Sequence, residues 1–226
     1  MWIKICGLND TQNAREVAQL GPDAIGLNFY GRSPRSVSIE IAAKIVSDLP
    51  ENVEPVGLFV NHSVDEILRT CRECAIRTVQ LHGDEPPEQL AELASANPDL
   101  RFIRAYRLGE QGFAALTVQL ERCKELGVGL DACLIDAKVD GMYGGSGKQA
   151  PRTVIRSEYR YDEWPPIVLA GGLNAVNISQ AIAEVRPWGI DVSSGVESRP
   201  GVKDIEQVSS FVRSARGRLE QKPFTE

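Results

Sequence analysis

The sequence predicts a single closed barrel of eight parallel strands and eight helices, the α/β fold known as the (β/α)8 or TIM barrel. Two observations support this fold class. Apolar runs of strand length alternate eight times with segments of helical period, which is typical of parallel strands joined by helical crossovers. The chain of 226 residues also has the usual length of one barrel, without a linker or a low-complexity segment. A doubly wound open sheet is the alternative, because the same alternation builds both folds.

The first four strand and helix pairs lie in the N-terminal half of the chain. Their strands are predicted at 2–6, 23–28, 55–61 and 78–81. The helices that follow these strands are predicted at 11–20, 39–49, 64–74 and 86–96. Gly21-Pro22 ends the first helix, Ser63 is a suitable N-cap for the third, and Pro86 begins the fourth.

The last four pairs lie in the C-terminal half. Their strands are predicted at 102–106, 132–136, 166–170 and 188–192. The corresponding helices are predicted at 113–126, 151–158, 174–184 and 203–216. The helix at 151–158 has the weakest helical pattern of the eight. Residues 1–216 therefore form the predicted barrel, and residues 217–226 form a polar C-terminal tail.

The composition excludes two classes of function. A formal net charge of -6 and a pI near 5.2 are unfavourable for a general nucleic-acid binder or a membrane-surface protein, because both need an excess of Lys and Arg. No segment has the pattern of a membrane span or a secretory signal. A small anionic substrate is compatible with this composition if cations and backbone amides converge locally.

The five cysteines are expected to be reduced thiols, because an odd, scattered set does not form a secreted disulfide framework. They stand at positions 6, 71, 74, 123 and 133. Cys71 and Cys74 form a C-x-x-C inside a predicted helix rather than at its start, and no second ligand pair accompanies them. We therefore predict neither a redox site nor a metal site. We expect a cytoplasmic protein that is a monomer.

Cys6 ends the first predicted strand and is followed by Gly7. The carboxyl end of a barrel strand is where such folds place reacting groups. A lone cysteine is also common as a small buried hydrophobe, so the position alone leaves both roles open. Lys4 faces the same side of the strand as Cys6, because side chains alternate along a strand. We expect cations near Cys6 to favour its thiolate, which is the reactive form.

Two aspartates end later strands. Asp136 follows the apolar run of the sixth strand, and a carboxyl group there is costly to bury unless it is paired. It is therefore either a structural hydrogen-bond acceptor or a catalytic acid with a raised pKa. Asp191, in the eighth strand, is expected to fix the following loop as an acceptor.

Two basic side chains are placed near the predicted barrel mouth. Arg35 lies in the loop after the second strand, and it is either a surface residue or a two-pronged ligand for a carboxylate. His82 follows the fourth strand, where it is either a substrate contact or a loop residue with satisfied hydrogen bonds.

Glycine- and serine-rich loops follow the last three strands. Such barrels commonly bind phosphate after strands seven and eight, through exposed backbone amides. Tight turns are the alternative role for these glycines. The candidate phosphate-binding residues are Gly145, Gly147, Gly171, Gly172, Ser193, Ser194 and Gly195. The loop after strand six is not a nucleotide-hydrolase phosphate loop, because Met142 and Gln149 stand where that motif needs Gly and Ser or Thr.

Eight segments in this order resemble the signature series of the phosphoribosylanthranilate isomerase family, barrel enzymes of tryptophan biosynthesis. The segments are 4–7, 33–35, 56–61, 80–83, 134–136, 144–147, 169–173 and 191–197. Each segment alone is weak, whereas the ordered set is highly specific. The sequence departs from the family pattern after Gly147, where 148–153 replaces an aromatic residue and an Asp-Trp pair.

The resemblance implies an Amadori rearrangement of an aminoaldose to an aminoketose, an intramolecular oxidation and reduction without a cofactor. Asp136 resembles the general acid that opens the ribose ring, and Cys6 resembles the general base that removes the neighbouring proton. Arg35 resembles the partner of the anthranilate carboxylate. The loops after strands six to eight resemble the phosphate clamp of a phosphosugar substrate.

Two other functions are compatible with the barrel. One is a different phosphosugar enzyme, although a ribulose-phosphate epimerase would need metal-binding histidines and only His62 and His82 are present. The other is a barrel that binds phosphosugars without converting them. The presence of both Cys6 and Asp136 argues against a binding-only role.

Overall fold

Eight parallel strands close into a barrel, in which each strand pairs with the next and β8 returns to β1. The computed structural model describes residues 1–109, 111–137, 143 and 149–217. The strands are β1 Trp2–Cys6, β2 Ala24–Asn28, β3 Glu54–Phe59, β4 Thr78–Leu81, β5 Arg101–Leu108, β6 Ala132–Ala137, β7 Ile167–Leu169 and β8 Gly189–Val192. This topology confirms the predicted barrel and excludes the open sheet.

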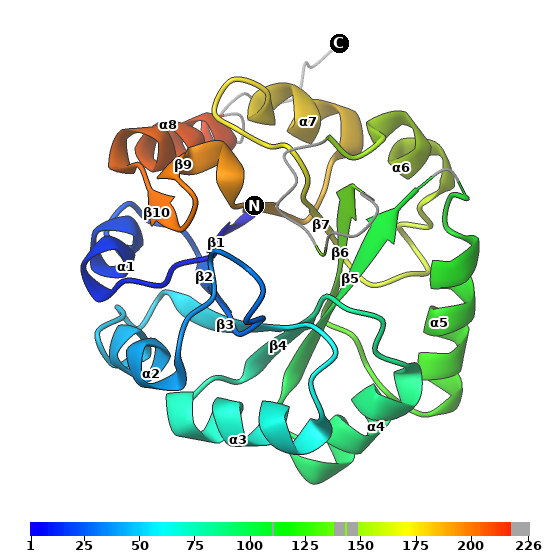
Figure 1. Ribbon diagram of the computed structural model, residues 1–226. Coiled ribbons are helices and arrows are strands. Elements are labelled where there is room, and N and C mark those ends of the chain that lie inside the picture. Colours follow the sequence, from blue (N-terminus) through cyan, green and yellow to red (C-terminus); the bar gives the residue numbers. More distant parts are fainter. Residues whose placement is uncertain (110, 138–142, 144–148, 218–226) are drawn as a thin grey trace.

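The α-helices of the described residues form a ring around the strands (Figure 1). They are α1 Thr11–Ala18, α2 Ile39–Ser47, α3 Val64–Cys74, α4 Pro87–Ala96, α5 Ala114–Glu125, α6 Arg152–Glu158, α7 Ile178–Val185 and α8 Ile205–Arg216. Ser63 caps α3 as predicted, in a reciprocal capping box with Glu66. None of these helices is long and apolar enough to span a membrane.

The strands are buried on both faces, as expected for a parallel sheet covered by helices. One set of strand side chains packs against the helices in the larger core. A second, separate cluster lies on the other face and includes Ala24, Val56, Leu134 and Val168. This inner cluster fills the barrel, and the polar groups of the cleft lie at the carboxyl ends of the strands.

Two helix starts differ from the prediction by two residues or more. Helix α7 begins at Ile178 instead of residue 174, because the Asn174 side chain accepts hydrogen bonds from the N–H groups of Val176 and Asn177 and stabilises a turn. Helix α8 begins at Ile205, where Asp204 is the N-cap. The predicted tail, apart from residue 217, lies outside the described residues.

Three short elements after β8 were not predicted. A 3₁₀ turn, η1, spans Ser194–Val196, and two short strands form an antiparallel hairpin. These strands are β9 Glu197–Arg199 and β10 Val202–Lys203. Strands of two or three residues show no hydrophobic period, so sequence pattern does not reveal them.

Candidate active site

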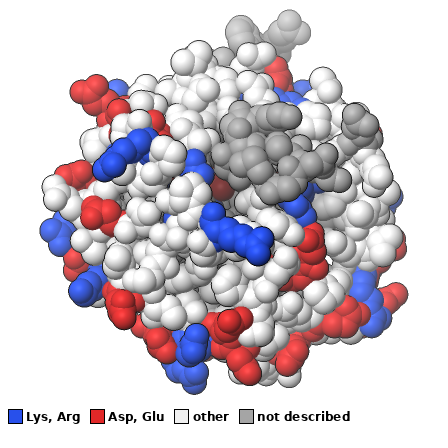
Figure 2. Space-filling model, in the orientation of Figure 1, with Lys and Arg blue, Asp and Glu red and all other residues white. Residues whose placement is uncertain are grey.

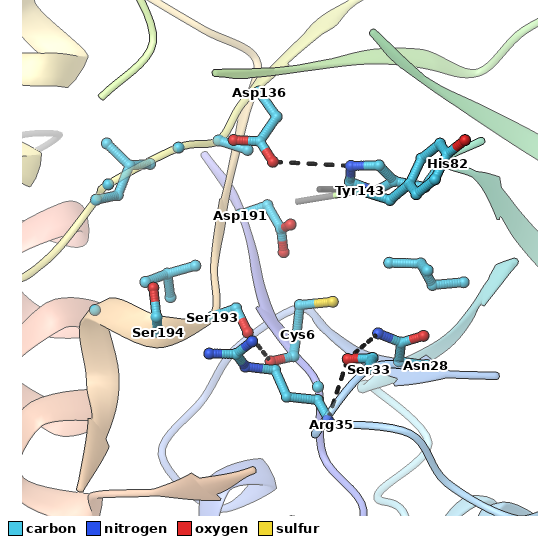
Figure 3. A pocket seen from close by; sticks show the side chains of 18 residues that line it. Cys6, Asn28, Ser33, Arg35, His82, Asp136, Tyr143, Asp191, Ser193 and Ser194 are labelled. Atoms are coloured by element: carbon cyan, nitrogen blue, oxygen red, sulfur yellow. Dashed lines mark hydrogen bonds and ion pairs between the residues drawn. The ribbon is translucent and has the colours of Figure 1, made fainter. Parts of the chain in front are cut away.

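A cleft opens at the carboxyl ends of the strands, and 18 of the described residues line it (Figure 3). Nine of the predicted site residues are among them: Cys6, Arg35, His82, Asp136, Gly171, Gly172, Ser193, Ser194 and Gly195. The other two predicted residues, Gly145 and Gly147, lie outside the described residues. The fold thus brings a thiol from the first strand and a carboxyl group from the sixth into one cleft.

Cys6 stands at the end of β1, and its side chain faces the cleft. Its neighbour across the sheet is Gly26 in β2. A Cβ atom at Gly26 would lie 2.6 Å from the Cys6 sulfur, so only glycine leaves room for the thiol in this orientation. On the other side, the Ser193 hydroxyl donates a hydrogen bond of 3.0 Å to the Cys6 carbonyl. The thiol is therefore fixed between β2 and the loop after β8.

Lys4 lies on the same inner face of β1 as Cys6, as predicted, and it is fully buried. Its Nζ atom donates to Asp191 Oδ1 at 2.8 Å, and the two residues are direct partners across the β1–β8 pairing. Burial alone would lower the pKa of Lys4, but Asp191 and Cys6 hold it above its ordinary value. The expectation that Asp191 fixes the following loop is wrong, since its side chain binds this ammonium group instead.

The expectation that nearby cations favour the Cys6 thiolate is confirmed in direction, since Lys4 and Lys203 both lower the pKa of Cys6, but burial has the larger effect. Burial raises the pKa of Cys6, and the charge of Asp191 raises it further. Lys4 and Lys203 act in the opposite direction without overcoming these effects. A thiolate without water around it is costly, so the resting group is a thiol beside an ammonium group.

Asp136 faces the same cleft from the end of β6. Its Oδ1 atom accepts a hydrogen bond of 2.7 Å from the N–H of Ala137. Burial raises the pKa of Asp136 to about 6, and the charge of Asp191 acts in the same direction. The Ala137 N–H, Lys4 and Arg107 oppose this shift. A carboxyl group with this pKa can donate a proton near neutral pH.

His82 follows β4 and is buried beside Asp136, with its Nε2 atom 3.8 Å from Asp136 Oδ2 (Figure 3). Burial lowers the pKa of His82 to about 3, and Lys4 and two arginines add to this effect. The imidazole is therefore neutral at physiological pH. Its Nδ1 atom pairs with Gln80 Nε2 at 2.9 Å, whereas Nε2 is buried without a hydrogen-bond partner among the described residues. The alternative of a loop histidine with all hydrogen bonds satisfied does not fit this geometry.

Arg35 is held in the loop after β2 by two local contacts. The Asn28 side-chain amide donates to the Ser33 hydroxyl, which accepts a second hydrogen bond from the Arg35 N–H. The Arg35 guanidinium donates through Nε and Nη2 to the two carboxylate oxygens of Glu197, both at 2.8 Å. With only 13% of its side chain exposed, Arg35 is not the surface residue that the sequence left possible.

The loops after β7 and β8 present backbone amides to the cleft. Gly171 and Gly172 adopt φ values of +87° and +61°, which favour glycine. A Cβ atom at Gly195 would lie 1.8 Å from the Leu173 carbonyl oxygen, so these two loops touch through a glycine. Among the hydrogen bonds of the described residues, none uses the N–H groups of Gly172, Ser194 or Gly195. Such amides are suitable ligands for a phosphate.

Three cleft or near-cleft residues had no role in the sequence analysis. Tyr143 lines the cleft; its hydroxyl donates to Asp84 at 2.7 Å, and the Arg107 guanidinium covers its ring. An aromatic residue inside a glycine-rich loop was a usable signal for it. Glu197 and Lys203 form an ion pair of 2.7 Å below Arg35. Glu197 lies in the motif segment 191–197, whereas no local pattern distinguishes Lys203 from a surface charge.

Some Lys and Arg side chains lie near the centre of the face that carries the cleft, although the chain has a net charge of -6. Figure 2 shows Lys and Arg side chains around the middle of this face, whereas acidic side chains lie mostly toward its rim. This arrangement favours the approach of a small anion.

Comparisons with known proteins agree with this geometry. The model of the family described as N-(5'phosphoribosyl)anthranilate (PRA) isomerase matches residues 3–214. The N-(5'-phosphoribosyl)anthranilate isomerase of Leptothrix cholodnii is 42% identical over 214 residues, which is 95% of this chain and 90% of that relative.

Two crystal structures support the same assignment. Phosphoribosyl anthranilate isomerase from Thermotoga maritima superposes with a TM-score of 0.81 and 35% identity, over 96% of this chain and 99% of that one. A phosphoribosyl anthranilate isomerase in complex with reduced 1-(o-carboxyphenylamino)-1-deoxyribulose 5-phosphate gives a TM-score of 0.78 and 32% identity, with the same coverage. The chain therefore belongs to the phosphoribosylanthranilate isomerase family.

Proposed function

We propose that this cleft converts N-(5-phosphoribosyl)anthranilate to 1-(2-carboxyphenylamino)-1-deoxyribulose 5-phosphate, with Asp136 as general acid and Cys6 as general base. The observation that carries the proposal is the presence of both groups in one cleft, together with a guanidinium group and a set of backbone amides that no hydrogen bond among the described residues uses. The name of the family and the ligand of the related crystal structure point to the same substrate class.

Ring opening is the first step of the proposed mechanism. Protonated Asp136 transfers its proton to the ring oxygen of the ribose, while the bond between this oxygen and C1 breaks. The lone pair of the anthranilate nitrogen forms a C=N bond to C1, which leaves a positively charged Schiff base. The Asp136 carboxylate that results faces the neutral His82 Nε2 at 3.8 Å, and Lys4 favours its negative charge.

Proton abstraction is the second step. The Cys6 thiolate removes the proton from C2, and the electron pair forms a C1=C2 bond and neutralises the Schiff base nitrogen. The enolamine then loses its hydroxyl proton and gains a proton at C1, which gives the ketone. C2 is oxidised and C1 is reduced within one molecule, so electrons balance without an external reagent. Lys4 and the positive charge of the Schiff base both favour the thiolate when the substrate is bound.

Substrate binding uses both ends of the cleft in this proposal. Arg35 binds the anthranilate carboxylate, and the amides of Gly172, Ser194 and Gly195 bind the phosphate. The remaining proposed contacts are Gly171, Ser193 and His82, with Gly145 and Gly147 retained as sequence predictions. Charge-assisted hydrogen bonds of this kind fix the sugar between the acid and the base.

The proposal is tested by adding purified protein to freshly made phosphoribosylanthranilate and following the loss of its fluorescence. We expect Cys6→Ser and Asp136→Asn each to lower kcat by about 10²- to 10⁴-fold, because each removes one proton-transfer group. Cys123→Ser is the matched control, since Cys123 is another buried thiol that does not line the cleft. Full activity in either cleft variant would contradict the mechanism, and absence of turnover by the natural chain would favour a binding-only barrel.

We further infer that the enzyme is a cytoplasmic monomer that acts on a free small molecule, without nucleic acid or membrane partners. Five buried cysteines without disulfides suit a reducing compartment. Light scattering during gel filtration measures the oligomeric state, and a mass of twice 24.7 kDa would contradict the monomer.

A further inference from the structure

The contact between Arg35 and Glu197 uses only one edge of the guanidinium group. Nε and Nη2 each donate one hydrogen bond to Glu197, at 2.8 Å. Of the five N–H donors of an arginine, the two on Nη1 and one on Nη2 remain. No hydrogen bond of the described residues uses Nη1. The second edge, between Nη1 and Nη2, is thus free to take another carboxylate in a two-pronged contact.

Glu197 is itself rigidly held. Only 4% of its side chain is exposed, and its Oε1 atom also accepts hydrogen bonds from Lys203 Nζ at 2.7 Å and from the Gly201 N–H at 3.3 Å. Burial alone would raise the pKa of Glu197, but Arg35 and Lys203 hold it below its ordinary value. The group is therefore an anion held between Arg35 and Lys203.

The hairpin of β9 and β10 brings this cluster against the loop that carries Arg35. Gly201 forms the turn of the hairpin with a φ of +84°, and a Cβ atom there would lie 3.1 Å from the Pro34 carbonyl oxygen. On the opposite side, a Cβ atom at Gly7 would lie 2.7 Å from Arg35 Cδ. The stem of Arg35 therefore lies against the exit of β1, with its head held by β9.

Lys203 extends the cluster toward the reacting groups. It is 2% exposed, and besides Glu197 it donates to the carbonyl and the hydroxyl oxygen of Ser193, at 3.2 and 3.3 Å. The Ser193 hydroxyl in turn donates to the Cys6 carbonyl. One chain of polar contacts thus joins Arg35, the loop after β8 and the backbone of the proposed base.

We propose that Glu197 is a positioning residue, which holds the Nε and Nη2 edge of Arg35 and thereby presents the other edge to the carboxylate of the substrate. The inference rests on the proposed role of Arg35 in binding that carboxylate. It makes the hairpin of β9 and β10 a specificity device, because a properly oriented guanidinium group matters only for a substrate that carries the carboxylate.

The test compares two substrates that differ only in this group. One is phosphoribosylanthranilate, and the other is phosphoribosylaniline, made from aniline and ribose 5-phosphate. The quantity measured is the ratio of kcat/KM for the two substrates, with product formation followed by chromatography. We expect Glu197→Gln to raise KM for phosphoribosylanthranilate about 10- to 30-fold with kcat within about threefold, and to lower the ratio by a similar factor. The kcat/KM of Glu197→Gln for phosphoribosylaniline should stay within about twofold of the value for the natural chain.

Glu88→Gln is the matched control, because Glu88 accepts a hydrogen bond of 2.8 Å from Arg122 Nε in an exposed pair outside the cleft. Its ratio should equal that of the natural chain. Glu197→Asp keeps the charge with a shorter reach and should give an intermediate ratio. If Glu197→Gln does not fold, Glu197→Asp decides: an unchanged ratio overturns the inference.

The results for Glu197→Gln and Arg35→Met together separate this inference from the function on which it rests. An unchanged or higher ratio in Glu197→Gln overturns the positioning role. This includes the case in which kcat/KM falls equally for both substrates, because an equal loss indicates a purely structural role. Arg35→Met should bring the ratio close to one. If the ratio stays high in Arg35→Met, the proposed contact between Arg35 and the substrate carboxylate is wrong. If the ratio falls to about one in Arg35→Met but is unchanged in Glu197→Gln, only the positioning role of Glu197 is wrong.

Discussion

At the scale of the residue, burial raises the pKa of both proposed catalytic groups and so favours their neutral forms. The pKa of Cys6 is raised above its ordinary value, and that of Asp136 is raised from 3.8 to about 6. For the acid this is favourable, because a protonated carboxyl group is what ring opening needs. For Cys6 the raised pKa is unfavourable, because proton abstraction needs the thiolate. The positive charge that develops on the substrate therefore has to assist ionisation of the thiol. At neutral pH the buried Asp136 carboxylate costs stability, because its pKa is raised.

The raised pKa of Asp136 predicts a pH-dependent stability. Between pH 3.8 and about 6 the folded state binds more protons at Asp136 than the unfolded state does, so this group makes the protein less stable as pH rises. We expect Asp136→Asn to increase the free energy of unfolding at pH 7.5 by on the order of 2 kcal/mol. This gain in the free energy of unfolding should become smaller as the pH is lowered toward 4.

Urea denaturation at both pH values measures this effect. Asp48→Asn is the control, because Asp48 is an exposed carboxylate paired with Arg15. That variant should show no gain at either pH. A loss of stability in Asp136→Asn that is equal at pH 7.5 and pH 4 would contradict a destabilising buried charge.

At the scale of the element, the loops after β7 and β8 form one unit through a single close approach. A Cβ atom at Gly195 would overlap the Leu173 carbonyl, since their separation would be 1.8 Å. We expect Gly195→Ala to push η1 away from the β7 loop, to raise KM for the phosphosugar at least tenfold, and to cost about 1–3 kcal/mol of stability.

Gly31→Ala provides the comparison for this variant, because a Cβ atom there meets nothing within 4 Å. It should leave KM and the melting temperature nearly unchanged. Steady-state kinetics and thermal unfolding of the two variants are sufficient measurements. A Gly195→Ala enzyme with natural KM would show that the amides of this unit do not bind the phosphate.

The boundaries of the elements show what local pattern can specify. The strands were predicted to within about two residues at each end, because apolar runs and the glycines or prolines that flank them are local signals. The pattern places the start of α7 too early. It puts Asn174 in the helix, whereas the Asn174 side chain stabilises the turn before the helix. The hairpin of β9 and β10 was missed because its strands are too short to show a period.

At the scale of the whole molecule, a buried ion pair joins the first and last strands of the barrel, whose pairing closes the sheet. Lys4 and Asp191 are 187 residues apart in sequence and 2.8 Å apart in space, and both are buried. We expect Lys4→Met to cost about 3–5 kcal/mol of stability, because it leaves the Asp191 carboxylate buried without a partner. The double variant Lys4→Met/Asp191→Leu should recover most of this loss.

Chemical denaturation of both variants tests the pair. Arg15→Met serves as the control, since it breaks an exposed pair with Asp48 and should cost less than about 1 kcal/mol. If Lys4→Met is no more costly than this control, the pair does not contribute to closure of the barrel.

The sequence by itself determined the alternation of strands and helices, the order of these elements and the strand ends at which Cys6 and Asp136 stand, whereas the structure decided between a closed barrel and an open sheet. These are local properties: a hydrophobic period, a turn residue and a position at the end of a run. The ordered motifs added the family, since together they are specific even where each is weak.

Only the tertiary structure decided which charges face one another. The partner of Arg35 is Glu197, 162 residues away, and the partner of Asp191 is Lys4 rather than the adjacent loop. The direction in which the pKa of Cys6 shifts also depends on the fold, because the effect of burial is larger than that of the Lys4 ammonium group. Periodicity fixes the face on which a side chain lies, whereas electrostatic energies depend on distances and solvent exclusion that exist only once the barrel has closed.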